Sequence, residues 1–161
     1  MRARAFDALW IKDFGEGEEN IRYEVTHLDA RLAVIVFENW ASGGGAHGFG
    51  GHQNLLFDWI QGRELKLSDI FSDPGTDVSA IAAQCMPQLK KQAAEAGKEV
   101  DTESNVSPIV ADVTKWAPNE RGLDIMFDPY IIAGNVSLKC RLAYAELAKW
   151  LKPGGPLPPR N

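Results

Sequence analysis

The strongest constraint on the fold is a pair of strand-like segments separated by only three residues. In residues 21–28 apolar and polar side chains alternate, which is typical of a strand buried on one face. Residues 32–40 begin with apolar side chains on both faces, which is typical of a strand near the centre of a sheet. Because residues 29–31 are long enough only for a turn, we expect the two strands to be antiparallel neighbours.

The rest of the chain continues this pattern and adds one long helix. Apolar residues recur at three- and four-residue spacing from about Thr76 to Ala96, which predicts a helix with one buried face, kinked or restarted at Pro87. Further strands are expected at residues 54–60, 64–67, 109–117, 122–128 and 136–142, and a short helix at residues 144–151. The sequence therefore predicts an α+β fold: a mostly antiparallel sheet of about six strands, one main helix packed on one face, and a short C-terminal helix.

The chain length of 161 residues suits one domain. Residues 1–20 are polar in their second half and are interpreted as a lead-in segment, and residues 21–151 are interpreted as a single α+β domain. Residues 152–161 contain four prolines and two glycines, so we expect a disordered tail there.

Charge and hydropathy exclude several classes of partner. The chain has 17 basic and 22 acidic residues, a net charge of −5, which argues against nucleic acid and favours a cationic partner. The longest apolar run, residues 32–37, is far shorter than the roughly 20 residues of a membrane span. The start of the sequence does not match a secretory signal, so we expect either a cytoplasmic protein or a leader that lies upstream.

The chain has two cysteines, Cys85 and Cys140. Cys85 lies on the apolar face of the expected long helix, and Cys140 lies on the inward face of the last expected strand. Two interpretations stay open at this point: the pair forms one disulfide, or both are buried thiols that pack as small hydrophobic residues.

Six of the fifteen glycines lie between residues 43 and 51, within a segment expected to be a loop over residues 42–52. Glycine-rich loops can bring backbone amides close to a phosphate. A phosphate loop needs a lysine and a serine or threonine at the start of a helix, however, and here Gln53 and a strand follow. The pattern therefore favours a shaped recognition loop.

Two histidines and an aspartate near this loop provide the main alternative. His47, His52 and Asp58 are ligand types found in catalytic zinc sites, so a metal-dependent hydrolase acting on cell-wall material is one hypothesis. The competing interpretation is that a histidine ties the glycine-rich segment to the sheet and that Asp58 accepts hydrogen bonds in the next turn. No nucleophile motif is present in the sequence, and we expect neither a catalytic residue nor a cofactor.

Aromatic residues suggest where a partner would bind. Trp40 and Trp59 flank the glycine-rich segment in the sequence, and large aromatic side chains often anchor interfaces. A second candidate surface is the break after the strand at residues 122–128, where a proline is followed by a tyrosine. The candidate binding residues are Trp40, Gly44, Gly45, His47, Phe49, His52, Trp59, Asp128, Pro129 and Tyr130.

Several short motifs occur in an order that resembles a known family. They are Gly44-Gly45-Ala46-His47, Phe57-Asp58, Gly62-Arg63-Glu64-Leu65, Leu67-Ser68-Asp69-Ile70-Phe71, Gly122-Leu123, Phe127-Asp128-Pro129-Tyr130 and Leu142-Ala143-Tyr144-Ala145-Glu146-Leu147. Over residues 21–151 the chain resembles the C-terminal domain of RsiV-type proteins. This domain of unknown function occurs in a lysozyme-sensing anti-sigma factor, in some peptidoglycan deacetylases and in envelope lipoproteins.

This resemblance implies an α+β domain located outside the cytoplasm, in the periplasm or cell envelope. It also implies a non-catalytic binding or sensing role, with a cationic protein such as lysozyme as partner. The alternatives are the metal-dependent hydrolase and a structural accessory domain without a ligand.

Overall fold

The computed structural model describes residues 18–42, 48–100 and 103–157. In these residues seven strands form two antiparallel sheets, with the strand orders β1-β2-β3-β4 and β5-β6-β7. The strands are β1 (Glu18–Leu28), β2 (Leu32–Ser42), β3 (Phe49–Asp58), β4 (Arg63–Glu64), β5 (Trp116–Pro118), β6 (Gly122–Phe127) and β7 (Leu138–Ala143). The helices are α1 (Leu67–Ile70), α2 (Pro74–Glu95), α3 (Val106–Ala111) and α4 (Tyr144–Leu147), with short 3-10 helices η2 (Glu103–Asn105) and η3 (Val113–Lys115).

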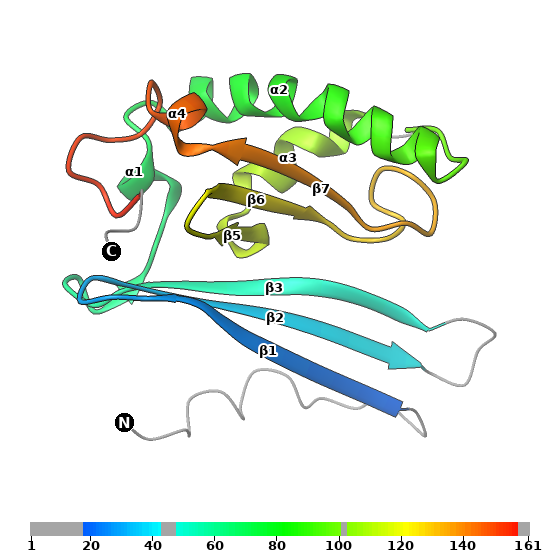
Figure 1. Ribbon diagram of the computed structural model, residues 1–161, viewed down its shortest axis with the longest axis horizontal. Helices are drawn as coiled ribbons and strands as arrows, with labels where there is room; N and C mark the ends of the chain where they lie inside the picture. The colour runs from blue at the N-terminus through cyan, green and yellow to red at the C-terminus, as the bar shows by residue number, and fades with distance from the viewer. Residues whose placement is uncertain (1–17, 43–47, 101–102, 158–161) are drawn as a thin grey trace.

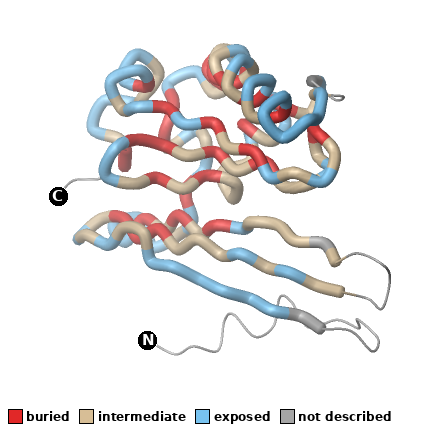
Figure 2. Tube along the Cα trace, turned by 45° about the vertical axis from the view of Figure 1, so that its right-hand side comes forward, coloured by how far each residue is buried: buried red, intermediate tan, exposed pale blue. Residues whose placement is uncertain are grey.

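The elements are arranged in layers. Figure 1 shows the first sheet below, the second sheet above it, and α2 on the far side of the second sheet. Helix α2 buries one face that includes Val78, Ile81 and Leu89, and Pro87 lies inside it without ending it. Figure 2 shows that burial is concentrated where the sheets and helices meet, whereas β1 is largely exposed.

The predicted α+β class is confirmed, and the strands are divided between two sheets instead of one. Strand β4 pairs with only the last two residues of β3. Farther along, the free edge of β3 at His52 is occupied by the side chains of Lys115 and Asp128. Because these side chains satisfy the backbone groups that another strand would need, the first sheet ends there.

The strand predicted at residues 109–117 is wrong for most of its length. This region contains α3 and η3, and only Trp116–Pro118 form a strand. Val106 and Val110, four residues apart, are both buried, as expected for one face of a helix. Pro108 falls in the first turn of α3, where its missing N–H has no cost. Short apolar runs such as residues 109–111 do not distinguish helix from strand.

Several element boundaries differ from the predicted ones. Strand β1 includes residues 18–20, which we expected to lie in the lead-in segment, and β3 includes residues 49–52 of the predicted loop. Helix α4 ends at Leu147, four residues earlier than predicted. Antiparallel pairing with β2 extends β3, because Phe49 and Gly50 lie opposite Ala41 and Trp40.

Residues 152–157, predicted to belong to a disordered tail, pack against the domain. Leu157 is only 3% exposed. The backbone N–H of Lys152 donates to the carbonyl of Ile70 at 2.7 Å, and the guanidinium of Arg31 donates to the carbonyl of Gly154 at 2.8 Å. The burial of one leucine and these hydrogen bonds stabilise one conformation of the segment, although its proline and glycine content is typical of a disordered tail.

The two cysteines form a disulfide, which confirms one of the two interpretations left open by the sequence. Cys85 of α2 is joined to Cys140 of β7, 55 positions along the chain. Both are fully buried in the main hydrophobic core. The disulfide therefore joins the long helix covalently to the second sheet.

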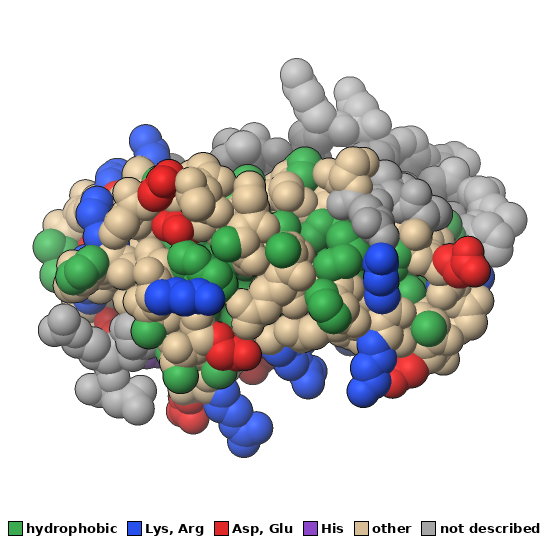
Figure 3. Space-filling view, turned by 90° about the horizontal axis from the view of Figure 1, so that it is seen from above, with side chains coloured by type: hydrophobic (Ala, Val, Ile, Leu, Met, Phe, Trp, Pro, Cys, Tyr) green, Lys and Arg blue, Asp and Glu red, His purple; other side chains and the backbone are tan. Residues whose placement is uncertain are grey.

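The surface carries charges of both signs. On the face viewed from above, basic and acidic side chains are interspersed among apolar ones (Figure 3). Among the described residues, none of the helices combines the length and the apolar character needed to cross a membrane.

Candidate functional site

A hollow of about 470 Å3 lies where the glycine-rich segment meets the connection between β6 and β7. We call it the aromatic groove, because Trp40 and Tyr130 line it from different elements and are 43% and 62% exposed. Its lining is Glu38, Asn39 and Trp40 of β2, Gly48 and the β3 residues Gly50, Gly51 and His52, and Pro129, Tyr130, Asn135 and Ser137 of the β6–β7 connection. Two segments that the sequence analysis singled out separately therefore form one site.

Two described glycines of the cluster, Gly48 and Gly50, lie where a side chain would not fit, and Gly48 makes room for Trp40. A Cβ atom on Gly48 would lie 2.5 Å from ring atoms of Trp40, and one on Gly50 would lie 2.9 Å from the carbonyl oxygen of Asn39. Such distances are far shorter than van der Waals contact. Glycine at position 48 allows the indole to lie directly against the backbone, and glycine at position 50 allows the close approach of the Asn39 carbonyl of β2. Packing therefore explains these two positions of the glycine cluster.

Replacing Gly48 by alanine is expected to displace the Trp40 indole. The added methyl group would overlap the ring, and the rearrangement should cost about 1 kcal/mol of unfolding free energy. The measurement is the NMR signal of the Trp40 indole N–H, assigned with Trp40→Phe. Gly75→Ala is the matched control, because a Cβ on Gly75 has only one neighbour, at 3.9 Å. An unmoved indole signal in Gly48→Ala would contradict this account.

Asp128 joins the strand β3 to the β6–β7 connection. Its Oδ1 accepts hydrogen bonds from the backbone N–H of His52 at 2.8 Å and from His52 Nδ1 at 2.8 Å. Its Oδ2 lies 2.7 Å from Lys115 Nζ, which also donates to the carbonyl of His52. Asp128 and Lys115 together therefore take the place of a neighbouring strand at the free edge of β3.

The protonation of this cluster follows from its contacts. Burial alone would raise the pKa of Asp128, but the hydrogen bonds from His52 and Lys115 and the charge of Lys115 outweigh it and hold the pKa below its ordinary value of 3.8. An ionised carboxylate only accepts hydrogen bonds, so Nδ1 of His52 carries the hydrogen. His52 thus ties the glycine-rich segment to the second sheet, as one of the two sequence interpretations expected.

The backbone holds Tyr130 in an unusual conformation. Its φ is +66°, the only positive value at a non-glycine residue in the described part of the chain. Its N–H donates to the carbonyl of Gly134, and the N–H of Ile131 donates to the carbonyl of Asp128 at 3.3 Å. Non-glycine residues in this region cost about 1–3 kcal/mol and concentrate at functional sites. The two hydrogen bonds stabilise this conformation, in which the exposed tyrosine ring lines the groove.

Two predicted site residues lie elsewhere. Asp58 ends β3 and Trp59 follows it, at the end of the sheet far from the glycine-rich segment, because Asp58 pairs with Leu32 whereas Gly50 pairs with Trp40. Trp59 instead contacts the ring of Phe57. Trp59 therefore flanks the glycine-rich segment in the sequence but does not lie beside it in space, because the β-strand between them is extended.

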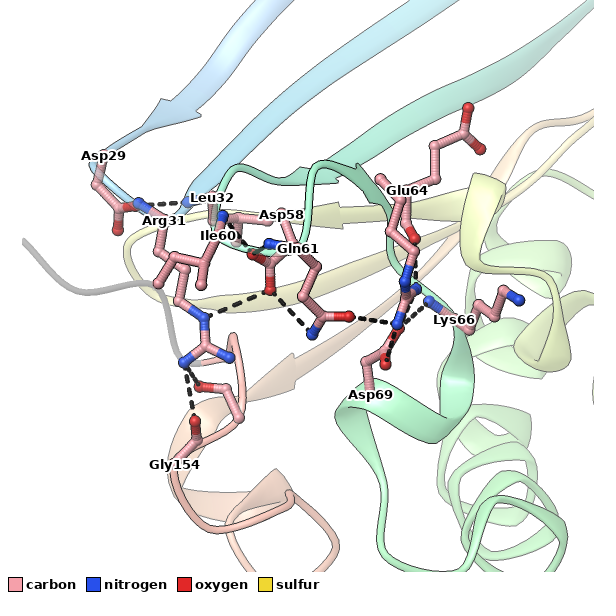
Figure 4. Close-up of polar contacts among 12 residues, drawn as sticks. Asp29, Arg31, Leu32, Asp58, Ile60, Gln61, Glu64, Lys66, Asp69 and Gly154 are labelled. Carbon is pink, nitrogen blue, oxygen red and sulfur yellow. Dashed lines mark hydrogen bonds and ion pairs between the residues drawn. The ribbon is translucent and has the colours of Figure 1, made fainter.

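Asp58 has a structural role in the turn after β3. Its Oδ1 accepts from the N–H groups of Ile60 at 2.8 Å and Gln61 at 3.0 Å, and its Oδ2 lies 3.5 Å from Arg31 Nε (Figure 4). It lies six positions along the strand from His52, roughly 20 Å away, so these two side chains do not converge on one metal ion. Within residues 18–42, 48–100 and 103–157, no three His, Cys, Asp or Glu side chains form a group that could hold one.

The remaining predicted residues have different outcomes. Gly44, Gly45 and His47 lie outside the described residues, and Phe49 begins β3. Lys115, Asn135 and Ser137 were not predicted. Each is an isolated polar residue without a motif, so no sequence signal distinguishes them; only the packing of the second sheet beside β3 brings them to the site.

Comparisons with known proteins agree on the fold. No protein-family model matches the chain. Over 116 residues it is 24% identical to the peptidoglycan-N-acetylmuramic acid deacetylase PdaC of Bacillus subtilis. The matched region covers 72% of this chain and 25% of that protein. The chain therefore spans about a quarter of this relative's length.

Two solved structures of DUF3298-family proteins are similar. The one from Bacteroides fragilis has a TM-score of 0.68 and 21% identity, covering 88% of this chain and 57% of its own. The one from Pseudomonas aeruginosa has a TM-score of 0.56 and 19% identity, covering 84% and 62%. The chain thus has the fold of these structures and is compatible with a DUF3298-type domain.

Proposed function

We propose that this chain is a non-catalytic binding or sensing module of the cell envelope and that the aromatic groove is its contact surface. The observation that carries the proposal is the convergence of Trp40 and Tyr130, both exposed, from segments far apart in the sequence. Exposed aromatic rings beside polar groups are typical of interface anchors. The backbone strain at Tyr130 is a second, independent argument for a role of this surface.

Two observations support a location outside the cytoplasm. The Cys85–Cys140 disulfide is of a kind that persists in oxidising compartments. The similar protein from Bacillus subtilis is named as a deacetylase of peptidoglycan, which is cell-wall material. Both favour an envelope protein that meets the cell wall or proteins acting on it.

The proposed partner is a cationic protein of the lysozyme type. The chain carries a net charge of −5, which would speed association with a basic protein at low ionic strength. The resemblance to RsiV-type domains points to the same class of partner. The groove is open and polar at its rim, with Glu38, Asn39 and Asn135 beside the aromatic rings, which suits a protein surface.

Calorimetric titration with a c-type lysozyme tests this proposal. We expect binding by the wild-type chain and at least tenfold weaker binding by Trp40→Ala and Tyr130→Ala, because central aromatic anchors contribute about 2 kcal/mol or more. Trp59→Ala is the matched control: it removes a partly exposed tryptophan at the other end of the sheet and should leave binding unchanged.

Two results would overturn the proposal. One is the absence of both binding and inhibition of lysozyme at tens of micromolar. The other is equal weakening by Trp59→Ala and Trp40→Ala, which would show that the groove is not the contact. Cosedimentation with insoluble peptidoglycan, lost in Trp40→Ala, would instead assign the groove to the cell-wall polymer.

A further inference from the structure

Strand β1 is a long, exposed edge strand. It has 11 residues and lies at the end of the strand order β1-β2-β3-β4, with β2 as its partner in the described part of the chain. Figures 1 and 2 show it at the margin of the molecule, away from the helices. Tyr23 is 72% exposed, and Ile21 and Val25 are about half exposed. An edge of this kind offers unpaired backbone groups to another strand.

Two copies of this strand have complementary side chains when they run antiparallel to each other. If two copies of β1 run antiparallel with Tyr23 opposite Tyr23, then Arg22 lies opposite Glu24 and Ile21 lies opposite Val25, each pair occurring twice by symmetry. Opposite charges and apolar pairs facing each other across strands are stabilising. Within its own sheet Glu24 lies opposite Val36, so no charged side chain lies directly opposite its carboxylate there.

We infer that two copies of this chain associate through β1, antiparallel and centred on Tyr23, and so form one continuous sheet. The pairing is isologous, as in most symmetric dimers. Its extent is limited by the β-bulge between Val25 and His27, which breaks the regular register. Residues 21–25 lie before the bulge and contain every pair named above. This inference does not depend on the aromatic groove.

Charge reversal tests the register. Sedimentation equilibrium over a wide concentration range should show a dimer for the wild-type chain. Glu24→Arg places arginine opposite Arg22 twice and should weaken the dimer at least tenfold; the double variant Arg22→Glu with Glu24→Arg should restore it. Glu95→Arg is the matched control, because Glu95 is an exposed glutamate on α2 and the charge change is the same. In Arg22→Glu, alone or within the double variant, the new carboxylate also lies opposite Glu38 of the same sheet. The thermal unfolding of both variants is therefore measured in parallel, and dimer formation is compared at a temperature at which both are folded.

Cysteine crosslinking gives a second test that does not depend on charge. Among the described residues the native cysteines are paired with each other. An introduced cysteine therefore supplies the free thiol that forms the crosslink between two copies. Oxidised Tyr23→Cys should form a covalent dimer, because residues on the symmetry axis have Cβ atoms about 5 Å apart. Ile21→Cys should crosslink to Val25→Cys and not to itself.

Three results would overturn the inference. They are a monomer at all concentrations, a double charge variant that fails to restore the dimer, and crosslinking of Ile21→Cys to itself in preference to Val25→Cys. The last would show association in another register or through another surface.

Discussion

Replacing Cys85 and Cys140 together by alanine is expected to lower the free energy of unfolding by about 4 kcal/mol. The disulfide closes a segment of 55 residues, and losing that restriction increases the entropy of the unfolded chain by roughly this amount. Both sites are fully buried in the core, so the helix α2 and strand β7 also lose packing contacts. Urea unfolding of the wild-type and variant proteins measures the difference.

A reduction experiment provides the control for this prediction. Wild-type protein unfolded and refolded in the presence of a thiol reductant should lose nearly as much stability as the variant, because both lack the crosslink and only the variant also loses the packing of the two sulfur atoms. A loss of less than about 1 kcal/mol in the double variant would contradict the entropic account. A large loss would also mean that the domain depends on an oxidising compartment for its full stability.

Replacing Asp128 by alanine is expected to cost about 3 kcal/mol at neutral pH. The change leaves the ammonium group of Lys115, which is mostly buried, without its partner at 2.7 Å, and leaves the N–H of His52 without an acceptor. Asp124→Ala is the matched control: this aspartate pairs with Lys139 at 3.1 Å nearer the surface, and its removal should cost under about 1 kcal/mol.

The cost of losing Asp128 should depend on pH. The folded-state pKa of Asp128 lies below its ordinary value, so its contribution is present above about pH 4 and is lost as the pH falls through the lower folded-state value. The difference in unfolding free energy between wild type and Asp128→Ala should therefore narrow on acidification. A difference that stays constant or widens toward pH 3 would contradict the assignment of Asp128 as an ionised acceptor.

Asp128→Ala should also weaken the binding of any ligand at the aromatic groove. Asp128 precedes Pro129 and Tyr130 and is bonded to His52, which lines the groove from β3. Without this bond, β3, which pairs with the strand that carries Trp40, loses its direct polar link to the connection that carries Tyr130. Asp124→Ala is again the control. Asp124 lies on β6 and outside the lining of the groove, so its replacement should leave the ligand affinity unchanged.

The glycine cluster shows how far sequence reasoning reaches. Its composition indicated a candidate recognition segment and argued against a phosphate loop, because no helix with a lysine follows. It did not reveal that Gly48 is needed by the indole of Trp40. That contact requires β2 and β3 to pair in one particular register, and a register is a property of two strands together.

The hypothesis of a metal site at His47, His52 and Asp58 also depended on strand pairing, which the sequence does not show. His52 and Asp58 are close in sequence, and a flexible loop would have let them meet. Antiparallel pairing extends the segment between them into a strand, so His52 turns to Asp128 and Asp58 turns to its own following backbone. Sequence distance alone does not show whether a segment is folded back or extended.

The α+β class, the first hairpin, the long amphipathic helix and the inward faces of both cysteines could be predicted without a structure, because these features follow from side-chain periodicity over a few residues. The tertiary structure alone decided the division into two sheets, the helix at Val106–Ala111, and the meeting of Trp40 with Tyr130 and of His52 with Asp128. These features depend on contacts between segments far apart in the chain, and such contacts form where packing and hydrogen bonding of the whole domain are best satisfied.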